Sequence, residues 1–216
     1  MNKNILVTGS AGQIGSELTM ALRQRYGNEN VAAGFHSTKP QGELKKSGPL
    51  ETFDCRDYQA LEQVVKKHRV KTIFHLAAVL SARGEAEPDL AWDVNLQGLR
   101  VVLEIARAHK CAVFFPSSIG AFGASTPPRN TPQETIQRPS TIYGITKLTG
   151  ELLCDYYNRE YGVDTRGLRY PGLISNKTLP GGGTTDYAVE IFYDALEKKK
   201  YTCCLKPDTY LDMMYM

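Results

Sequence analysis

A tyrosine and a lysine stand four residues apart at Tyr143 and Lys147, within the stretch TIYGITK. On a helix, residues at this spacing share one face, so the phenol and the ammonium would lie one turn apart. A nearby positive charge stabilises a phenolate and lowers the pKa of the phenol, which is about 10 in free tyrosine. A phenolate can remove a proton from an alcohol while a hydride leaves the same carbon. The pair therefore predicts an acid–base device for alcohol oxidation.

The surroundings of this pair matter, because chance alone gives about one Tyr–Lys pair at this spacing in a chain of this composition. Ser117 and Ser118 end a predicted strand at residues 112–118. In open α/β sheets, ligands bind beyond the carboxyl ends of the strands. A serine hydroxyl at that place would hold the alcohol oxygen in line. We therefore expect Ser118, Tyr143 and Lys147 to be the catalytic residues.

A glycine loop follows the first predicted strand, in the stretch TGSAGQIG. Gly9 permits a tight turn, Gly12 lets the backbone approach a pyrophosphate, and Gly15 lets the next helix pack close to the sheet. The N-terminus of that helix supplies N–H groups and a partial positive charge to the phosphates. Three glycines at this spacing are weak evidence by themselves. Because these three lie between a predicted strand and a predicted helix, they predict a dinucleotide site.

Strands and helices alternate along the chain. Short apolar runs predict strands at residues 4–9, 30–35, 50–55, 71–78, 112–118 and 164–172. Helical periodicity predicts helices at residues 13–27, 57–69, 95–110 and 144–162. Residues 36–49 and 120–140 are predicted to be long loops. The alternation indicates the α/β class, with a doubly wound parallel sheet of the Rossmann type.

Composition and charge restrict the possible functions. The net charge of +3 is too small to indicate nucleic-acid binding. The five cysteines and four histidines show no ligand spacing, so no metal site is expected. No run of apolar residues is long enough to predict a membrane span. The first strand begins near residue 4, which leaves no room for a signal peptide, and a cytoplasmic location is expected.

The glycine pattern, the stretch HLAA and the set Ser118, Tyr143 and Lys147 resemble the extended short-chain dehydrogenases/reductases. Further stretches are similar to the short-chain type of L-threonine 3-dehydrogenase, above all PGGGTTDYAVEIFYDAL at residues 180–196. The resemblance runs the whole length of the chain. It implies oxidation of L-threonine at C3 to 2-amino-3-oxobutyrate, with NAD as the hydride acceptor.

The resemblance also implies individual roles. Tyr143 would be the general base, with Lys147 lowering its pKa and holding the nicotinamide ribose. Ser118 would orient the substrate hydroxyl, with Ser117 close by. The other expected cofactor contacts are Gly9, Gly12, Gln13, Ile14 and Gly15 at the pyrophosphate, Asp54 and Cys55 at the adenine, Leu76, Ala77 and Ala78 in the cleft, and Tyr170, Pro171 and Leu173 at the nicotinamide. Thr185, which follows Thr184 in the glycine-rich stretch, would bind the amino-acid carboxylate and amine together with Ser81.

Two features depart from the family pattern. An NAD enzyme usually carries a carboxylate at the end of the second strand, whereas this chain has His36, Ser37 and Lys39 there. His36 or Ser37 would bond the ribose hydroxyls, and NADP is not excluded. The family also continues beyond Met216. We therefore expect residues 1–171 to form the dinucleotide-binding domain and residues 172–216 to begin a small C-terminal substrate lobe in a truncated chain.

Two other functions remain open. A nucleotide-sugar epimerase or dehydratase uses the same Ser–Tyr–Lys set with bound NAD, although the compact stretch GGGTTDYA suits a small polar substrate better. A non-catalytic dinucleotide sensor is the second alternative. The family also implies a homodimer, formed through the helices predicted at residues 95–110 and 144–162.

Overall fold

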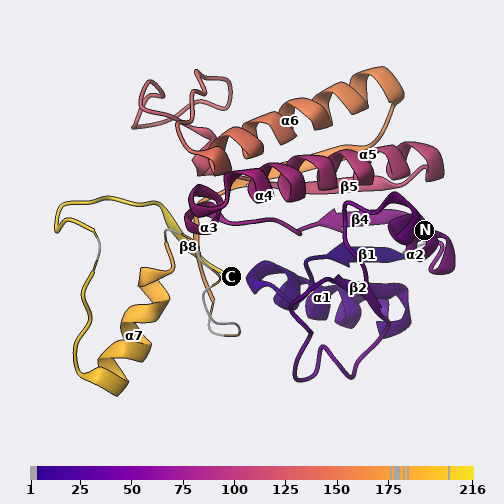
Figure 1. The fold of residues 1–216 in the computed structure, drawn as a ribbon, viewed down its shortest axis with the longest axis horizontal. Helices are drawn as coiled ribbons and strands as arrows, with labels where there is room; N and C mark the ends of the chain where they lie inside the picture. The colour runs from indigo at the N-terminus through magenta and orange to yellow at the C-terminus, as the bar shows by residue number, and fades with distance from the viewer. Residues whose placement is uncertain (1–3, 176, 178–180, 182, 184, 204) are drawn as a thin grey trace.

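The computed structural model describes residues 4–175, 177, 181, 183, 185–203 and 205–216 (Figure 1). Its centre is a six-stranded parallel sheet in the order β3-β2-β1-β4-β5-β6. The strands are β1 (Ile5–Thr8), β2 (Val31–Phe35), β3 (Leu50–Thr52), β4 (Thr72–His75), β5 (Ala112–Ser118) and β6 (Thr165–Tyr170). The structure thus confirms the predicted doubly wound α/β fold.

The strand order reverses between β1 and β4. The chain runs outward from β1 to β3 and then returns to place β4 on the other side of β1. Thr8, the last residue of β1, pairs with His75, the last residue of β4. A crevice outside the carboxyl ends of these two strands is the usual ligand site of such a sheet. The glycine loop follows β1 at this place.

Helices cover both faces of the sheet. They are α1 (Gln13–Tyr26), α2 (Tyr58–Lys67), α3 (Ser81–Ala86), α4 (Pro88–Trp92), α5 (Gly98–His109), α6 (Ile142–Tyr161) and α7 (Tyr187–Lys198). Leu6 points into a core with α2, α5 and α6, whereas its neighbours Ile5 and Val7 pack with residues of α1. Successive side chains of a strand point to opposite faces, so α1 lies on the face opposite α2, α5 and α6.

Local signals set several helix ends. The side chain of Asp57 accepts a hydrogen bond from the N–H of Ala60 at the start of α2, at 3.0 Å. Thr141 caps α6 in the same way through the N–H of Gly144, so this helix begins earlier than residue 144. Gly162 ends it in the left-handed region, with φ of +67°.

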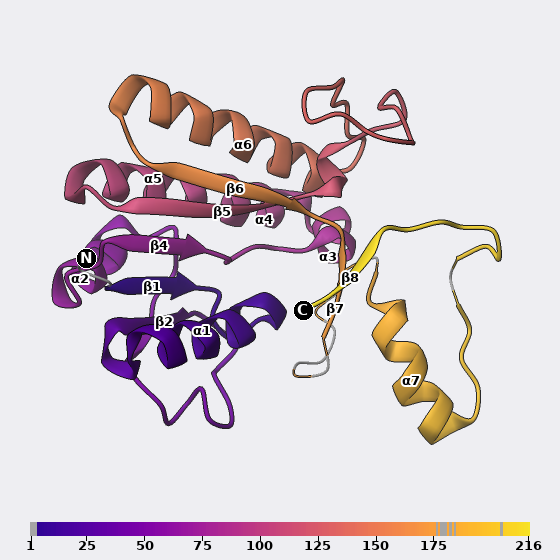
Figure 2. The same cartoon turned by 180° about the vertical axis from the view of Figure 1, so that it is seen from behind.

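The structure differs from the prediction in several elements. The helix predicted at residues 95–110 begins as a π-helical turn (Asp93–Gln97) and continues as α5. Helices α3, α4 and α7 were not predicted, nor was a two-stranded parallel sheet of β7 (Gly172–Ile174) and β8 (Met213–Tyr215). In Figures 1 and 2, α7 and β8 project beyond the carboxyl end of the large sheet.

A buried arginine holds the loop at residues 36–49 in place. Arg23 on α1 donates hydrogen bonds to the carbonyls of Val31, Leu44 and Pro49 at 3.2, 2.8 and 2.8 Å. It also donates to the hydroxyl of Ser47 at 2.9 Å. Burial lowers the pKa of this guanidinium, although the charge of Glu29 opposes that effect. These hydrogen bonds therefore fix the inner side of the loop, although the loop has no regular secondary structure.

None of the helices within the described residues combines the length and apolar character that crossing a bilayer requires. Within the same residues, no cluster of three His, Cys, Asp or Glu side chains is arranged to hold a metal ion.

Candidate active site

The turn after β1 requires glycine at two positions. Gly9 has φ of +63°, and a Cβ atom there would lie 2.7 Å from the backbone nitrogen of Ala77. A Cβ atom on Gly15 would lie 2.2 Å from the carbonyl oxygen of Gly9. Any side chain at either position would collide with backbone, so α1 can approach the sheet this closely only with glycine. Leu76, Ala77 and Ala78 follow β4 directly beside this turn.

The N-terminus of α1 is open to an anion. Gly12 is its N-cap, makes no side-chain capping bond, and is followed by a first turn without an acidic residue. Two buried polar atoms beside it, Ser10 Oγ and Gln13 Nε2, have no hydrogen-bond partner among the described residues. Free N–H groups, a positive helix end and unpaired donors suit a pyrophosphate. The loop fits the dinucleotide expected from the sequence.

The adenosine end is less sharply defined. His36 and Ser37 are exposed after β2. Asp54 accepts hydrogen bonds from Arg56 at 2.6 to 3.1 Å, and these bonds outweigh burial and hold the pKa of Asp54 below its usual value. Cys55 is buried, and burial raises the pKa of its thiol to about 11. Cys55 is therefore a packing residue here and an unreactive thiol.

Ser118 and Tyr143 meet above the end of β5. The hydroxyl of Ser118 accepts a hydrogen bond from the N–H of Gly120 at 3.0 Å. A Cβ atom on Gly120 would lie 3.3 Å from the Tyr143 ring and 3.4 Å from Ser118 Oγ, so the two side chains lie next to each other. Tyr143 is half-buried at the start of α6. Burial raises the pKa of this phenol, and the Ser118 hydroxyl offsets part of that rise. The serine and the tyrosine expected from the sequence are therefore neighbours at the end of β5.

Lys147 lies under the tyrosine as the four-residue spacing predicts. It is 5% exposed, and its Nζ lies 5.5 Å from the centre of the Tyr143 ring. Nζ donates to the carbonyl of Pro116 at 2.8 Å, and burial lowers the pKa of this ammonium to about 8. The expected lowering of the Tyr143 pKa is not found in this structure, because the ammonium bonds a carbonyl and burial of the phenol dominates.

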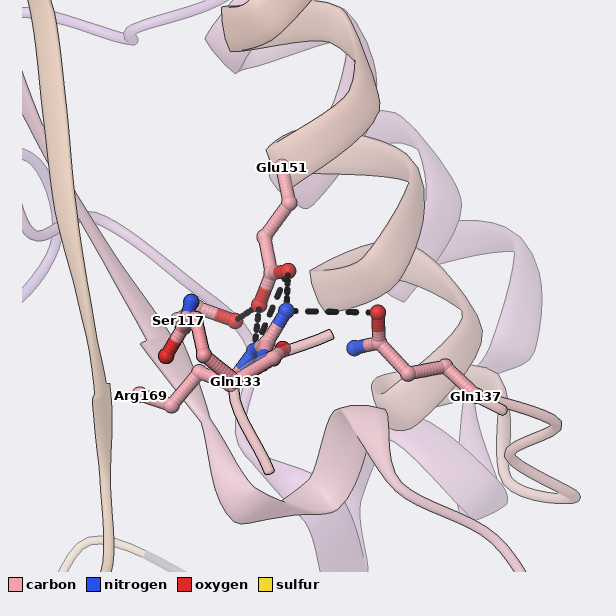
Figure 3. A network of polar contacts seen from close by, with 5 residues as sticks. All are labelled: Ser117, Gln133, Gln137, Glu151 and Arg169. Carbon is pink, nitrogen blue, oxygen red and sulfur yellow. Dashed lines mark hydrogen bonds and ion pairs between the residues drawn. The ribbon is translucent and has the colours of Figure 1, made fainter. Parts of the chain in front are cut away.

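Ser117 points away from the serine–tyrosine pair, because neighbouring residues of a strand face opposite sides. Its hydroxyl donates to Glu151 on α6, which also binds Arg169 of β6 through Nε at 2.9 Å and Nη2 at 2.7 Å. Figure 3 shows these side chains converging on the Glu151 carboxylate, with Gln137 alongside. Burial raises the pKa of Glu151, but the bonds from Arg169 and Ser117 bring it below the usual range. The hydroxyl of Ser117 is therefore bonded to Glu151, and its expected part in substrate binding stays a prediction.

The remaining predicted residues lie toward the small sheet. Tyr170 and Leu173 line a cavity of about 320 Å³ together with Ile14, opposite Met214 and Met216. Pro171 stands between β6 and β7. Thr185 precedes α7, and its methyl carbon would lie 2.7 Å from a Cβ atom on Gly172. Ser81 opens α3. Thr184 lies outside the described residues.

A polar residue that was not predicted, Asn95, connects the segment after β4 with α6. Asn95, in the π-helical turn, accepts from the N–H of Val79 at 2.7 Å and donates to the hydroxyl of Thr146 at 3.1 Å. Thr146 in turn donates to the carbonyl of Tyr143 at 2.8 Å. The signal in the sequence is an amide at an inward position of an amphipathic helix.

His75 is another buried polar residue that was not predicted to belong to the site, and it contacts β1. It is 2% exposed, and its Nδ1 lies 3.0 Å from Thr8 Oγ1, which accepts from the N–H of Ala77 at 3.2 Å. Its Nε2 has no partner among the described residues. Burial, and to a smaller extent the charge of Lys147, lowers the pKa of His75 to about 3. The imidazole is therefore neutral at the end of β4.

The sequence matches one protein family over most of its length. A model described as "NAD dependent epimerase/dehydratase family" matches residues 5–205. A curated relative from Staphylococcus haemolyticus, an uncharacterized epimerase/dehydratase, is 50% identical over 214 residues. The match covers 99% of this chain and 67% of the relative, so the chain spans about two thirds of that protein's length.

Solved structures give a closer description. An L-threonine dehydrogenase from Clostridium difficile is 52% identical, with a TM-score of 0.93, and the match covers 99% of this chain and 67% of that one. A holo-form L-threonine dehydrogenase from Cupriavidus necator is 48% identical, with a TM-score of 0.92 and coverage of 98% and 68%. A metagenomic L-threonine 3-dehydrogenase described as monomeric is 47% identical, with a TM-score of 0.92 and coverage of 98% and 67%. The expected homodimer thus has no support from these relatives.

Proposed function

The chain belongs to the NAD-dependent epimerase/dehydratase family, and we propose that it oxidises L-threonine at C3 to 2-amino-3-oxobutyrate. The contact of Ser118 with Tyr143, above the buried Lys147, carries this proposal. The set stands at the carboxyl end of β5, the edge of the sheet where the glycine loop also lies. Similarity to L-threonine dehydrogenases of about half-identical sequence supports the choice of substrate.

We assign the roles as follows. Tyr143 takes the proton of the C3 hydroxyl, and the neighbouring hydroxyl of Ser118 holds the C3 oxygen by a hydrogen bond. Lys147 supplies positive charge beneath the ring, which favours the phenolate during proton transfer. The cofactor, when bound, accepts the hydride that leaves C3. Charge balances because the proton leaves on Tyr143 and the electron pair leaves with the hydride.

A nicotinamide dinucleotide fits the residues at the loop. Gly9 and Gly15 let the turn and α1 pack tightly against backbone, and the uncapped start of α1 offers N–H donors to a pyrophosphate. We propose NAD as the natural form, with His36 and Ser37 bonding the adenosine ribose. The nearby Asp54 is already neutralised by Arg56, so little negative charge would repel a 2′-phosphate. Cofactor preference is therefore a separate measurement.

We further propose two units of function. Residues 1–171 would bind the dinucleotide, and residues 172–216 would begin the substrate side. Thr185 and Ser81 would then bind the carboxylate and the amine of threonine. The second candidate reaction is epimerisation or dehydration of a nucleotide sugar, which the description of the matched family favours.

The test is the absorbance of reduced nicotinamide with L-threonine and either NAD or NADP. We expect signal growth with L-threonine, and a loss of at least about a hundredfold in Tyr143→Phe. Tyr156→Phe is the matched control, because Tyr156 stands on the same helix with its side chain exposed. Equal rates in Tyr143→Phe and the wild type would refute the mechanism. Turnover of a nucleotide sugar in place of threonine would establish the second candidate.

A further inference from the structure

Helix α6 contacts the last three residues of β5 with side chains spaced four residues apart. The Tyr143 ring lies beside Ser118 Oγ, since a Cβ atom on Gly120 would lie 3.3 and 3.4 Å from them. Lys147 donates to the carbonyl of Pro116 at 2.8 Å. The next position in this series is Glu151, which accepts from the hydroxyl of Ser117. The catalytic tyrosine and lysine thus belong to a longer series of contacts that fixes the helix along the strand.

The third contact is anchored by an ion pair that is mostly buried. Glu151 and Arg169 are 18% and 17% exposed at the side chain, and the guanidinium binds both carboxylate oxygens. Two parallel N–H···O bonds fix the direction of approach as well as the distance. An ion pair in this geometry orients α6, β5 and β6 relative to one another.

Arg169 also reaches both ends of the segment between the two catalytic groups. Its Nη1 donates to the carbonyl of Gln133 at 3.0 Å, and its Nη2 donates to the side chain of Gln137 at 3.2 Å. Its guanidinium lies over the ring of Phe122, 5.2 Å from the ring centre. Residues 119–141 connect Ser118 to Tyr143 with only one short 3-10 turn (Ile119–Ala121). This segment therefore depends on side-chain contacts for its shape.

We propose that Glu151 and Arg169 are positioning residues for the reaction, acting through Ser117 and the loop at residues 119–141 to hold Ser118 and Tyr143 in contact. Neither residue touches the reacting atoms in this arrangement. The proposal rests on the proposed function for its effect on turnover, but its effect on the loop is independent of the substrate. Small displacements of a positioned group can lower rates by about a hundredfold.

The experiment compares Glu151→Gln and Arg169→Ala with the wild-type chain. The matched control is Arg166→Ala, since Arg166 stands on the same strand in an exposed ion pair with Asp164. Amide hydrogen exchange reports the loop at residues 119–141 without any reaction. In both variants we expect exchange there to be at least about tenfold faster, with β1 and α1 unchanged. The control should match the wild type.

Turnover provides the second measurement. We expect kcat to fall about 10- to 100-fold in both variants while the KM for the dinucleotide is unchanged, because β4 and β5 separate β6 from β1, which the glycine loop follows. Glu151, Ser117 and Arg169 line a cavity of about 240 Å³, so added guanidinium can enter the space left in Arg169→Ala. Guanidinium, but not sodium at equal ionic strength, should then restore kcat.

The outcomes separate the two proposals. A wild-type chain that does not oxidise threonine would refute the proposed function, and loop exchange would still test the positioning role. Unchanged exchange in Glu151→Gln and Arg169→Ala would overturn the positioning role even if the wild type is active. Faster exchange across the whole sheet in both variants would overturn it as well, since the pair would then serve only overall stability.

Discussion

Replacing His75 by glutamine should remove a large part of the acid sensitivity of this fold. His75 is 2% exposed, and burial lowers the pKa of its imidazole to about 3. In the unfolded chain this pKa is about 6.5. As the pH falls below about 6.5, His75 therefore binds a proton in the unfolded chain but stays neutral in the folded chain. The folded state loses stability over this range, and the loss continues until the pH approaches 3.

The magnitude follows from the difference between the two pKa values. Each pH unit in this interval costs about 1.4 kcal/mol of unfolding free energy. Between about pH 6.5 and about pH 4.5, His75 should account for a loss of roughly 3 kcal/mol, a large share of the stability of an ordinary domain. The unpartnered Nε2 explains the size, since no acceptor among the described residues compensates a second proton.

The assay is urea unfolding followed by circular dichroism near pH 7 and near pH 4.5. The single tryptophan, Trp92, is 45% exposed and would report weakly by fluorescence. Carboxylates such as Glu151 also lose stability in acid, so the useful quantity is the difference between wild type and His75→Gln at the two pH values. His36→Gln, at an exposed histidine, is the control and should keep the wild-type loss.

An equal loss of free energy in His75→Gln and the wild type would refute this reasoning. It would mean that the imidazole finds a partner or water for its second proton, and that the end of β4 is more polar than the structure indicates.

Two further predictions concern the cofactor loop and the catalytic lysine. Gly15→Ala should weaken dinucleotide binding by at least about a hundredfold in calorimetric titration, because its Cβ would lie 2.2 Å from the Gly9 carbonyl oxygen; retained affinity would contradict the close approach of α1. Burial lowers the pKa of Lys147 to about 8, whereas its value in the unfolded chain is about 10.4. Between about pH 8 and about pH 10.4 the unfolded chain therefore holds one more proton than the folded chain, and the unfolding free energy should rise with pH. Relative to Lys147→Met, the wild type should gain about 2 kcal/mol in urea unfolding between about pH 8 and about pH 9.5, and no gain would show that the lysine stays charged.

Much of the fold follows from local patterns. The run Ile5–Thr8 is fully buried, as a central strand of a parallel sheet must be, and the predicted strands all occur. The small sheet could not be predicted, because it pairs Gly172–Ile174 with Met213–Tyr215 across about 40 residues. Nothing in either short stretch specifies such a partner. Helix α7 was not predicted, because the glycine-rich stretch before it obscures the sequence signal for the start of a helix.

The candidate site could be predicted where its residues lie on a single helix or strand, because their spacing then fixes their relative positions. The four-residue interval predicted that Lys147 lies on the same helix face as Tyr143, and the end of the strand predicted that Ser118 lies close to Tyr143. The interval could not predict the direction of the pKa shift of Tyr143, because burial and the acceptor for Lys147 are set by tertiary contacts. The pleat of the strand turns Ser117 away from Ser118 and toward Glu151, a contact that the two adjacent serines in the sequence do not indicate.

The polar residues that were not predicted show how the site is assembled. Two of the proposed catalytic residues are bonded to other elements. Lys147 bonds the carbonyl of Pro116 in β5, and the carbonyl of Tyr143 is linked through Thr146 and Asn95 to the backbone of Val79, in the segment after β4. The segment that follows β4 is thus bonded to the helix that carries Tyr143. Because these bonds are buried and directional, a shift of either element would break several of them together. The geometry that the proposed proton and hydride transfer requires therefore depends on the connected core. The four-residue interval between Tyr143 and Lys147 indicates this geometry but does not determine it.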